Sequence, residues 1–164
     1  MMARDPIFAD PLSNLALAVF RCNGALIALG DSLVAPLGLT SARWQVLGAV
    51  IEARGQLSVA SIARNMGLVR QSVQRVVKDL ASLGLVRIEP NPHHRRAHLV
   101  QVTQEGERRF ECASAAWLAH TATLSANLPL DQLEELVSLL GKIRAGLGEL
   151  AVSDAVSLLA TDGG

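Results

Sequence analysis

The protein has 164 residues, which is enough for one domain or for two small lobes that share a core. Half of the residues are hydrophobic. Even so, no uninterrupted apolar run approaches the roughly 18 residues of a membrane span, and the first residues lack the apolar core of a signal peptide. Two widely separated cysteines, Cys22 and Cys112, fit a reduced protein better than a disulfide scaffold. We therefore expect a cytoplasmic protein with no membrane segment.

The net charge of zero hides a basic centre. Residues 62–98 carry seven bases and two acids, whereas residues 99–164 carry four bases and nine acids, and residues 1–61 carry four of each. A basic stretch between neutral and acidic flanks indicates a local surface for a polyanion. The alternative is an uneven scatter of charges with no functional meaning.

The first two helices are predicted from their caps. Asp10 followed by Pro11 is typical of a helix start, and apolar residues then recur at helical spacing until about residue 36. The segment "PLGLT" ends this helix, because proline and glycine continue a helix poorly. Thr40 or Ser41 caps the next helix, which "ARGQ" ends.

Two short helices and two β-type runs come next. Ser58 caps a helix that Gly67 ends, and "VRQSVQRVVKDLASLG" then forms a second helix that Gly84 ends. The runs "LVRIEP" and "AHLVQVT" follow and predict a β-hairpin with the tip "NPHHRR". The second helix has an apolar stripe that consists of Val73, Val76, Val77, Leu80 and Leu83.

Two more helices are expected toward the C-terminus. Thr103 caps a helix that runs to about Asn127 and has two acids in its first turn. Asp131 and Glu134 have the spacing of a capping box at the start of the last helix. Residues 151–164 form a tail with helical fragments, and we expect its end to be partly disordered.

Two short helices followed by a β-hairpin is the order of a winged helix-turn-helix. The apolar stripe of the second helix buries against the first helix, so its opposite face points outward and carries no acid before Asp79. Arginine and glutamine read guanine and adenine edges in the major groove, and lysine and serine suit phosphates. The outward face therefore predicts contacts to double-stranded DNA through Arg70, Gln71, Ser72, Gln74, Arg75 and Lys78.

The hairpin tip is at the position of a wing. It carries His93, His94, Arg95 and Arg96, in the hairpin that follows the second helix, which is the recognition helix of such a motif. An arginine on a narrow loop can enter the minor groove, where negative potential is concentrated. These four residues are therefore predicted to contact DNA as well.

The run "LSVASIARNMGLVRQSVQRVVKDLASLGLVRIEPNPHHRRAHLVQVTQEG" resembles the MarR family of bacterial transcriptional regulators. The resemblance rests on the pattern "VxRVVxxLxxxGLV", on a wing that ends in "RRA", and on "VTxxG" before the next helix, and it covers roughly residues 10–148. It implies a homodimer on a roughly palindromic operator, and in many members release by a small ligand or by oxidation. We expect the regulator to be a repressor. The resemblance also implies a DNA-binding lobe of residues 40–103 and a dimerisation lobe of residues 10–36 and 104–150.

Two positions depart from the family pattern. Many members have Ser, Thr or Asp where Val69 starts the recognition helix, and an Asp before the paired arginines where this chain has His94. We therefore expect that the recognition helix has no side-chain cap and that Arg95 lacks its usual acidic partner.

Three further sites are weighed from the residues. A metal site would need His93, His94 and His98 to converge with a fourth ligand such as His120, and adjacent histidines on a tight turn point apart, so no metal is predicted. Cys22 as a redox sensor is the alternative to a buried structural cysteine, which we favour, and Cys112 is expected to be inert. A pocket for a small-molecule effector is predicted from Phe20, Arg21, Asn23, Trp44 and Trp117, with ordinary packing as the alternative.

Enzymatic motifs are absent from the sequence. It contains no glycine-rich phosphate loop, no G-x-S-x-G and no H-E-x-x-H, so no catalysis and no cofactor are expected. The fold class expected is mostly α with a small antiparallel β-hairpin, as a winged helix-turn-helix lobe plus a helical dimerisation lobe. The function expected is sequence-specific DNA binding that regulates transcription, and a winged helix used for protein contacts is the alternative.

Overall fold

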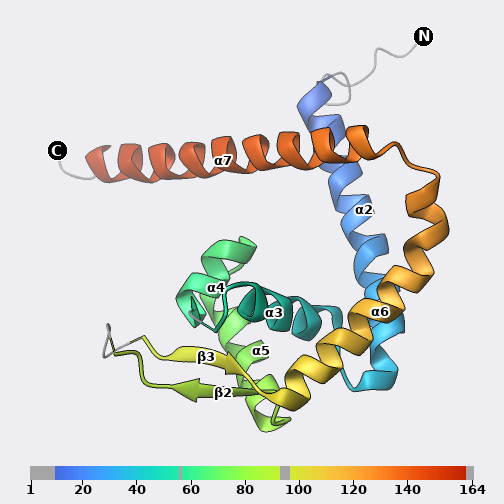
Figure 1. Ribbon diagram of the computed structural model, residues 1–164. Coiled ribbons are helices and arrows are strands. Elements are labelled where there is room, and N and C mark those ends of the chain that lie inside the picture. The colour runs from blue at the N-terminus through green and yellow to red at the C-terminus, as the bar shows by residue number, and fades with distance from the viewer. Residues whose placement is uncertain (1–9, 56, 93–96, 162–164) are drawn as a thin grey trace. The chain divides into compact units, whose positions relative to one another are not determined.

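The computed structural model of the protein describes residues 10–55, 57–92 and 97–161, with side chains described up to residue 150. It consists of helices and one small antiparallel sheet, so the predicted fold class is confirmed (Figure 1). The described chain up to Ala119 forms one compact unit, and the chain from His120 onward forms a second. The predicted division into a DNA-binding lobe and a dimerisation lobe concerns a dimer and stays a prediction.

Helix α2 (Pro11–Val34) begins where its cap predicted. The Asp10 carboxylate accepts hydrogen bonds from the hydroxyl and the backbone N–H of Ser13, both at 2.7 Å. These bonds hold the pKa of Asp10 below its ordinary value, because they favour the charged form. The helix ends in the short 3-10 turn η1 (Ala35–Leu37), and Gly38 reverses the chain with a φ of 67°.

Helix α3 (Ser41–Glu52) is capped by Thr40, as one of the two predicted options. Its first residue also joins it to α2. The Ser41 N–H donates to Oδ1 of Asp31 at 2.6 Å, and the Ser41 hydroxyl donates to the carbonyl oxygen of Ile27 at 3.1 Å. Ser41 is buried at this contact, and α2 supplies hydrogen-bond partners for its N–H and its hydroxyl.

Helices α4 (Val59–Met66) and α5 (Arg70–Ser82) follow with the predicted ends. Ser58 caps α4 by accepting the Ser61 N–H at 3.2 Å, and Gly67 ends it in the left-handed conformation. The apolar faces of α3, α4 and α5 meet in the core of the first unit. Its fully buried side chains include Leu47, Val50, Ile62, Val73, Val77 and Leu80.

One residue of the predicted stripe lies outside the core. Leu83 is 42% exposed, because α5 ends at Ser82 and Leu83 is its C-cap. Gly84 then adopts a φ of 70°, and the Leu85 N–H donates back to the carbonyl oxygen of Leu80 at 2.9 Å. After this turn Leu85 is fully buried in the core, where helical spacing had predicted Leu83.

The predicted hairpin consists of β2 (Val86–Glu89) and β3 (Leu99–Val102), which pair antiparallel with Val86 opposite Val102. A third strand, β1 (Leu57–Ser58), pairs with the other edge of β3, so the order is β1-β3-β2. The sequence did not predict β1, because two residues are too short to show an alternating pattern. The tip between β2 and β3 includes residues 93–96, which lie outside the described residues.

Helix α6 (Gln104–Ala126) begins at Thr103, as predicted. The Thr103 hydroxyl oxygen accepts the Gly106 N–H at 3.1 Å, and the Thr103 N–H donates to the carbonyl oxygen of Leu85 at 3.0 Å. A Cβ built on Gly106 would lie 2.1 Å from that same carbonyl oxygen. Glycine is therefore required here for α6 to pack closely against the chain that leads into β2.

A charged cluster lies in the first turns of α6. Glu105 accepts hydrogen bonds from Arg108 at 2.8 Å and from Arg109 at 2.7 Å. The Arg108 hydrogen bond, followed by that of Arg109, lowers the pKa of Glu105 to about 2. Arg109 also donates to the carbonyl oxygen of Leu37 at 3.0 Å, which ties α6 to the end of η1.

In the second unit, helix α7 (Leu130–Thr161) starts earlier and ends later than predicted. The Leu133 N–H bonds to the carbonyl oxygen of Pro129, so Asp131 lies inside the first turn and does not cap a helix. The expected capping box is therefore wrong. The helix also continues past Gly148 to Thr161, where the sequence predicted a tail with helical fragments.

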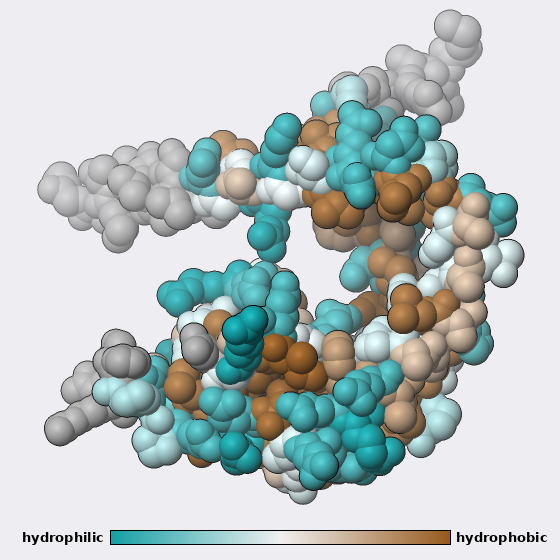
Figure 2. Space-filling view, in the orientation of Figure 1, coloured by the Kyte–Doolittle hydropathy of each residue, from teal (hydrophilic) through white to brown (hydrophobic). Residues whose placement is uncertain are grey.

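Helix α2 exposes an apolar surface. By length and composition, Pro11–Leu37 is sufficient to cross a membrane, although none of its most apolar stretch is buried. The expectation of no membrane segment stays a prediction, because a helix of a soluble protein can meet the same two criteria. The helix also carries Arg21 and Asp31, and Asp31 bonds to α3. Figure 2 shows hydrophobic side chains on the surface of the described part of α7 as well.

Candidate nucleic-acid interface

The recognition helix α5 is held by its buried stripe and not by an N-terminal side chain. Val69 precedes it in extended conformation and makes no side-chain cap hydrogen bond, as the departure from the family pattern predicted. Val73, Val77 and Leu80 are fully buried against α3 and α4. This anchoring fixes the rotation of the helix about its own axis, and therefore which side chains point outward.

The outward face of α5 brings together the predicted major-groove residues. Arg70, Gln71, Ser72, Arg75 and Lys78 are exposed, and Gln74 is half-buried. All of these except Ser72 line one shallow hollow of about 500 Å³. The hollow has cationic and amide donors on its walls and no carboxylate lining it. Such a surface suits a phosphate backbone and the acceptor edges of bases.

Asp79 is the acidic residue of α5, and it forms an ion pair with Arg43, which sequence reasoning missed. Nη2 of Arg43, on α3, lies 3.3 Å from Oδ2 of Asp79, with the side chains 28% and 48% exposed. The pair neutralises the acid next to Lys78 without burying either charge. No local pattern could have predicted this contact, because its partners are 36 residues apart.

The foot of the wing adjoins the same helix. A second hollow of about 220 Å³ is lined by the start of α4, by α5 and by both wing strands, and includes Arg70, Gln74 and His98. On β2, Arg87 pairs with Glu89. The predicted wing contacts His93, His94, Arg95 and Arg96 lie outside the described residues, so their role stays a prediction.

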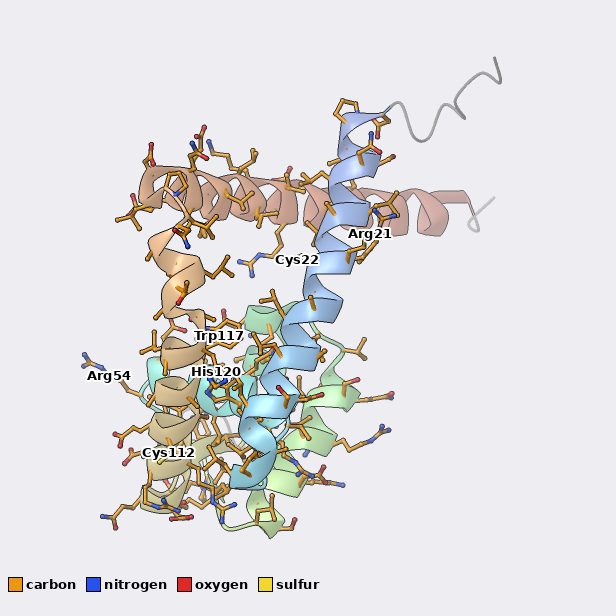
Figure 3. All side chains as sticks on the ribbon, turned by 90° about the vertical axis from the view of Figure 1, so that its right-hand side faces the viewer. Arg21, Cys22, Arg54, Cys112, Trp117 and His120 are labelled. Atoms are coloured by element: carbon orange, nitrogen blue, oxygen red, sulfur yellow. The ribbon has the colours of Figure 1, made fainter. Side chains whose placement is uncertain are left out.

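The predicted effector residues are only partly brought together. The rings of Trp44, on α3, and Trp117, on α6, pack with centroids 5.8 Å apart and an interplanar angle of 53°. Nε1 of Trp44 is buried and has no hydrogen-bond partner among the described residues. Phe20, Arg21 and Asn23 are exposed on α2, and Figure 3 places Arg21 further toward the N-terminal end of α2 than the level of Trp117.

The cysteines are placed differently from the prediction. Cys22 and Cys112 are both free and exposed (Figure 3), so the expected burial of Cys22 as a structural cysteine is wrong. The reason is that Cys22 lies on the part of α2 that precedes its contacts with α3. Among the described residues, no group of three or more histidine, cysteine or acidic side chains is arranged to hold a metal ion.

Comparisons with known proteins agree with this geometry. Residues 37–97 match the model of the MarR family. The chain is 39% identical to an uncharacterised protein of Mycobacterium tuberculosis over 100 residues, which cover 61% of this chain and 68% of that protein. It is 30% identical to the transcriptional activatory protein BadR of Rhodopseudomonas palustris over 122 residues, which cover 68% of this chain and 69% of BadR.

Solved structures share the fold. A mutant of MarR from E. coli complexed with operator DNA is 25% identical, with a TM-score of 0.68 over 79% of this chain and 93% of that one. CouR from Rhodococcus jostii RHA1 bound to p-coumaroyl-CoA is 24% identical, with a TM-score of 0.72 over 79% of this chain and 90% of CouR. The fold and these comparisons define a winged-helix transcriptional regulator. The chain belongs to the MarR family.

Proposed function

We propose that the protein is a sequence-specific regulator that binds a roughly palindromic operator in double-stranded DNA as a homodimer, in the cytoplasm, and represses transcription by occupying it. The observation that carries the proposal is the outward face of α5. Its donors line one hollow without a carboxylate, and Arg43 neutralises Asp79 beside it. The operator DNA in the solved E. coli MarR complex supports the same class of partner.

Selection of bound fragments from genomic DNA tests the proposal directly. The full chain is expected to enrich a few fragments that share an inverted repeat, with half-sites about one helical turn apart. Transcription in vitro from an enriched promoter is then expected to fall as the protein is added. A rise would assign activation, the role that the name of BadR carries, and enrichment of no sequence would favour a winged helix for protein contacts.

The homodimer is proposed from the apolar surface that each unit exposes. In the first unit, Phe20 is 71% exposed on α2, where an isolated folded chain would bury such a side chain. In the second unit, α7 exposes several large apolar residues. A second copy of the chain would bury both sets. The exposed large apolar residues on the two helices include Leu12, Leu17, Leu26, Leu29, Leu136, Val137, Leu147 and Leu150.

Sedimentation tests the dimer. The full chain is expected to sediment as a dimer at micromolar concentration without detergent. The segment 40–104 is expected to be a weak DNA binder, because it lacks the N- and C-terminal helices proposed to form the dimer. Phe20→Asp is expected to shift the full chain toward monomer. A stable monomer of the unchanged chain would contradict the proposal, and a requirement for detergent would assign α2 to a membrane.

A small-molecule effector is proposed at the two tryptophans. The buried N–H of Trp44 lacks an acceptor among the described residues, and an unmade hydrogen bond of this kind costs about 1–3 kcal/mol. A ligand with an aromatic ring and a carboxylate would pack against the indoles and accept that hydrogen bond. The ligand in the CouR structure supports a small-molecule effector in a protein of this fold.

Thermal shift measurements with a panel of aromatic carboxylic acids test the effector. At least one acid is expected to raise the melting temperature of the wild type and to release DNA. Trp44→Phe keeps a ring but removes the N–H, so it is expected to lose the shift, whereas Trp117→Phe keeps most of it. Equal shifts in wild type and Trp44→Phe would remove the indole N–H from the site.

A further inference from the structure

Two apolar side chains are exposed beside the polar face of α5. Leu68 and Val69 occupy the turn between α4 and α5, and their exposed fractions are 48% and 67%. They directly precede Arg70 and Gln71, which line the 500 Å³ hollow. The apolar patch is therefore continuous with the candidate DNA surface, at the end of the recognition helix that enters the major groove first in helix-turn-helix proteins.

The backbone holds this turn in one conformation. The Leu68 N–H donates to the carbonyl oxygen of Ala63 at 2.9 Å, which together with left-handed Gly67 closes the end of α4. The carbonyl oxygen of Val69 accepts the N–H of Ser72 at 3.0 Å. Valine is also stiff at its first side-chain torsion. Its methyl groups are thus presented to a partner at little cost in conformational entropy.

A valine at this position gives up a local stabilising interaction. A serine, threonine or aspartate at the N-cap would accept a backbone N–H of the first turn, and Val69 cannot. A sequence that breaks a local rule on an exposed surface does so most often at a functional site. Val69 is both the unusual cap residue and part of the exposed apolar patch. One contact of Val69 with a partner would therefore account for both features.

We propose that Val69, with Leu68 beside it, contacts thymine 5-methyl groups in the major groove and is a specificity-determining residue of this regulator. The inference rests on the proposed function. Among the groups that bases present in the major groove, the thymine methyl is the apolar one. The neighbouring arginine and glutamine read polar edges, so the apolar pair extends the same reading to adjacent A·T pairs. A protein partner is disfavoured by the cationic surroundings of the patch.

Replacement of thymine by uracil removes only the methyl group and tests the contact. The full chain first selects duplexes from a random library. Each thymine of the selected half-site is then replaced by deoxyuridine, one position at a time, and affinity is measured at constant salt. At one or two positions per half-site, the affinity of the wild type is expected to fall about fourfold for each thymine methyl that it buries. This loss corresponds to about 0.8 kcal/mol of binding free energy.

Protein variants measured on the same thymine and uracil duplexes identify the residue that contacts the methyl group. Val69→Ala is expected to bind the thymine duplex more weakly and to be insensitive to uracil at the position that it contacts. Leu83→Ala is the matched control, because Leu83 is an exposed apolar residue at the opposite end of α5, and it is expected to keep the full sensitivity. Circular dichroism melting checks that both variants fold.

The outcomes separate the inference from the proposed function. Specific binding that is insensitive to uracil at every position overturns the inference and leaves the proposed function intact. The inference is also overturned, and the proposed function kept, if the selected site has no fixed thymine. The same conclusion holds if Val69→Ala and Leu68→Ala both keep the wild-type sensitivity to uracil. Failure to select any DNA overturns the proposed function, and the inference with it.

Discussion

Arg43 of α3 and Asp79 of α5 form an ion pair in which Nη2 lies 3.3 Å from Oδ2. Both side chains are partly exposed, and such pairs contribute about 0.2–1 kcal/mol to stability. The position of the pair beside Lys78 gives it a second effect. It cancels a negative charge that would otherwise face the phosphates of bound DNA.

The first prediction follows from that cancellation. Arg43→Gln is expected to lower DNA affinity several-fold, because it leaves the Asp79 charge uncompensated near phosphates, while the free energy of unfolding falls by less than about 1 kcal/mol. Adding Asp79→Asn to Arg43→Gln is expected to restore most of the affinity. Fluorescence anisotropy on a selected duplex measures both. An affinity that stays low in the double variant would show that Arg43 acts by another route.

The second prediction separates base reading from phosphate binding on α5. Arg75→Ala and Gln71→Ala are each expected to cost about 1–3 kcal/mol on the selected sequence and much less on random DNA, because two-pronged base contacts are lost. The ratio of specific to random affinity is the measurement. Equal losses on both kinds of DNA would assign Arg75 to the backbone.

The third prediction concerns the close approach of Gly106 to Leu85. Gly106→Ala is expected to lower the free energy of unfolding by about 1–3 kcal/mol, because its Cβ would lie 2.1 Å from a backbone carbonyl oxygen that cannot move freely. Gly148→Ala is the control, because a Cβ there meets nothing within 4 Å, and it is expected to stabilise α7 by about 0.5–1 kcal/mol. Urea denaturation measures both. Similar effects of the two substitutions would count against the packing described.

The fourth prediction is a pH dependence of stability. The two arginines lower the pKa of Glu105 from an ordinary 4.5 to about 2, so the folded state favours the charged carboxylate. Its contribution to stability is therefore complete above about pH 4.5 and is lost as the pH falls toward 2. Glu105→Gln is expected to melt below the wild type at pH 7, with a difference that shrinks between pH 4.5 and pH 2.

Glu107→Gln is the control for that pH profile, because Glu107 shares the first turn of α6 but not the two arginine hydrogen bonds. Its melting temperature is expected to follow the wild type across the same range. A difference between wild type and Glu105→Gln that persists at pH 2, or a Glu107→Gln profile identical to that of Glu105→Gln, would show that the arginine bonds do not stabilise the carboxylate.

Local signals in the sequence predicted what depends on neighbours in the chain. Asp10, Ser58 and Thr103 all cap the helices assigned to them, since a cap acts within three residues. The same local reasoning failed at Asp131. Helix α7 already begins at Leu130, so Asp131 lies inside its first turn and not at the cap position before the helix. The outward face of α5 followed from its buried stripe, so the residues that line its hollow could be named from the sequence, while their contact with DNA stays a prediction.

Contacts between distant segments could not be predicted in the same way. The Arg43–Asp79 pair joins residues far apart in the chain, and the Ser41 contact with Asp31 depends on how α3 crosses α2. Burial was also misjudged on the part of α2 that precedes its contacts with α3. Cys22 lies on an apolar helix and was expected inside, but no other described helix of its unit covers it.

The salt dependence of DNA binding tests the central claim most directly. Affinity for a selected duplex is measured from about 50 to 300 mM salt for the wild type and for Lys78→Ala. Each neutralised phosphate contributes about −0.9 to the slope of log affinity against log salt. A dimer that presents Lys78 twice is therefore expected to have a steep negative slope, which Lys78→Ala makes shallower by about 2. A wild-type slope near zero, or an identical slope in the variant, would contradict a DNA-binding role for this face of α5.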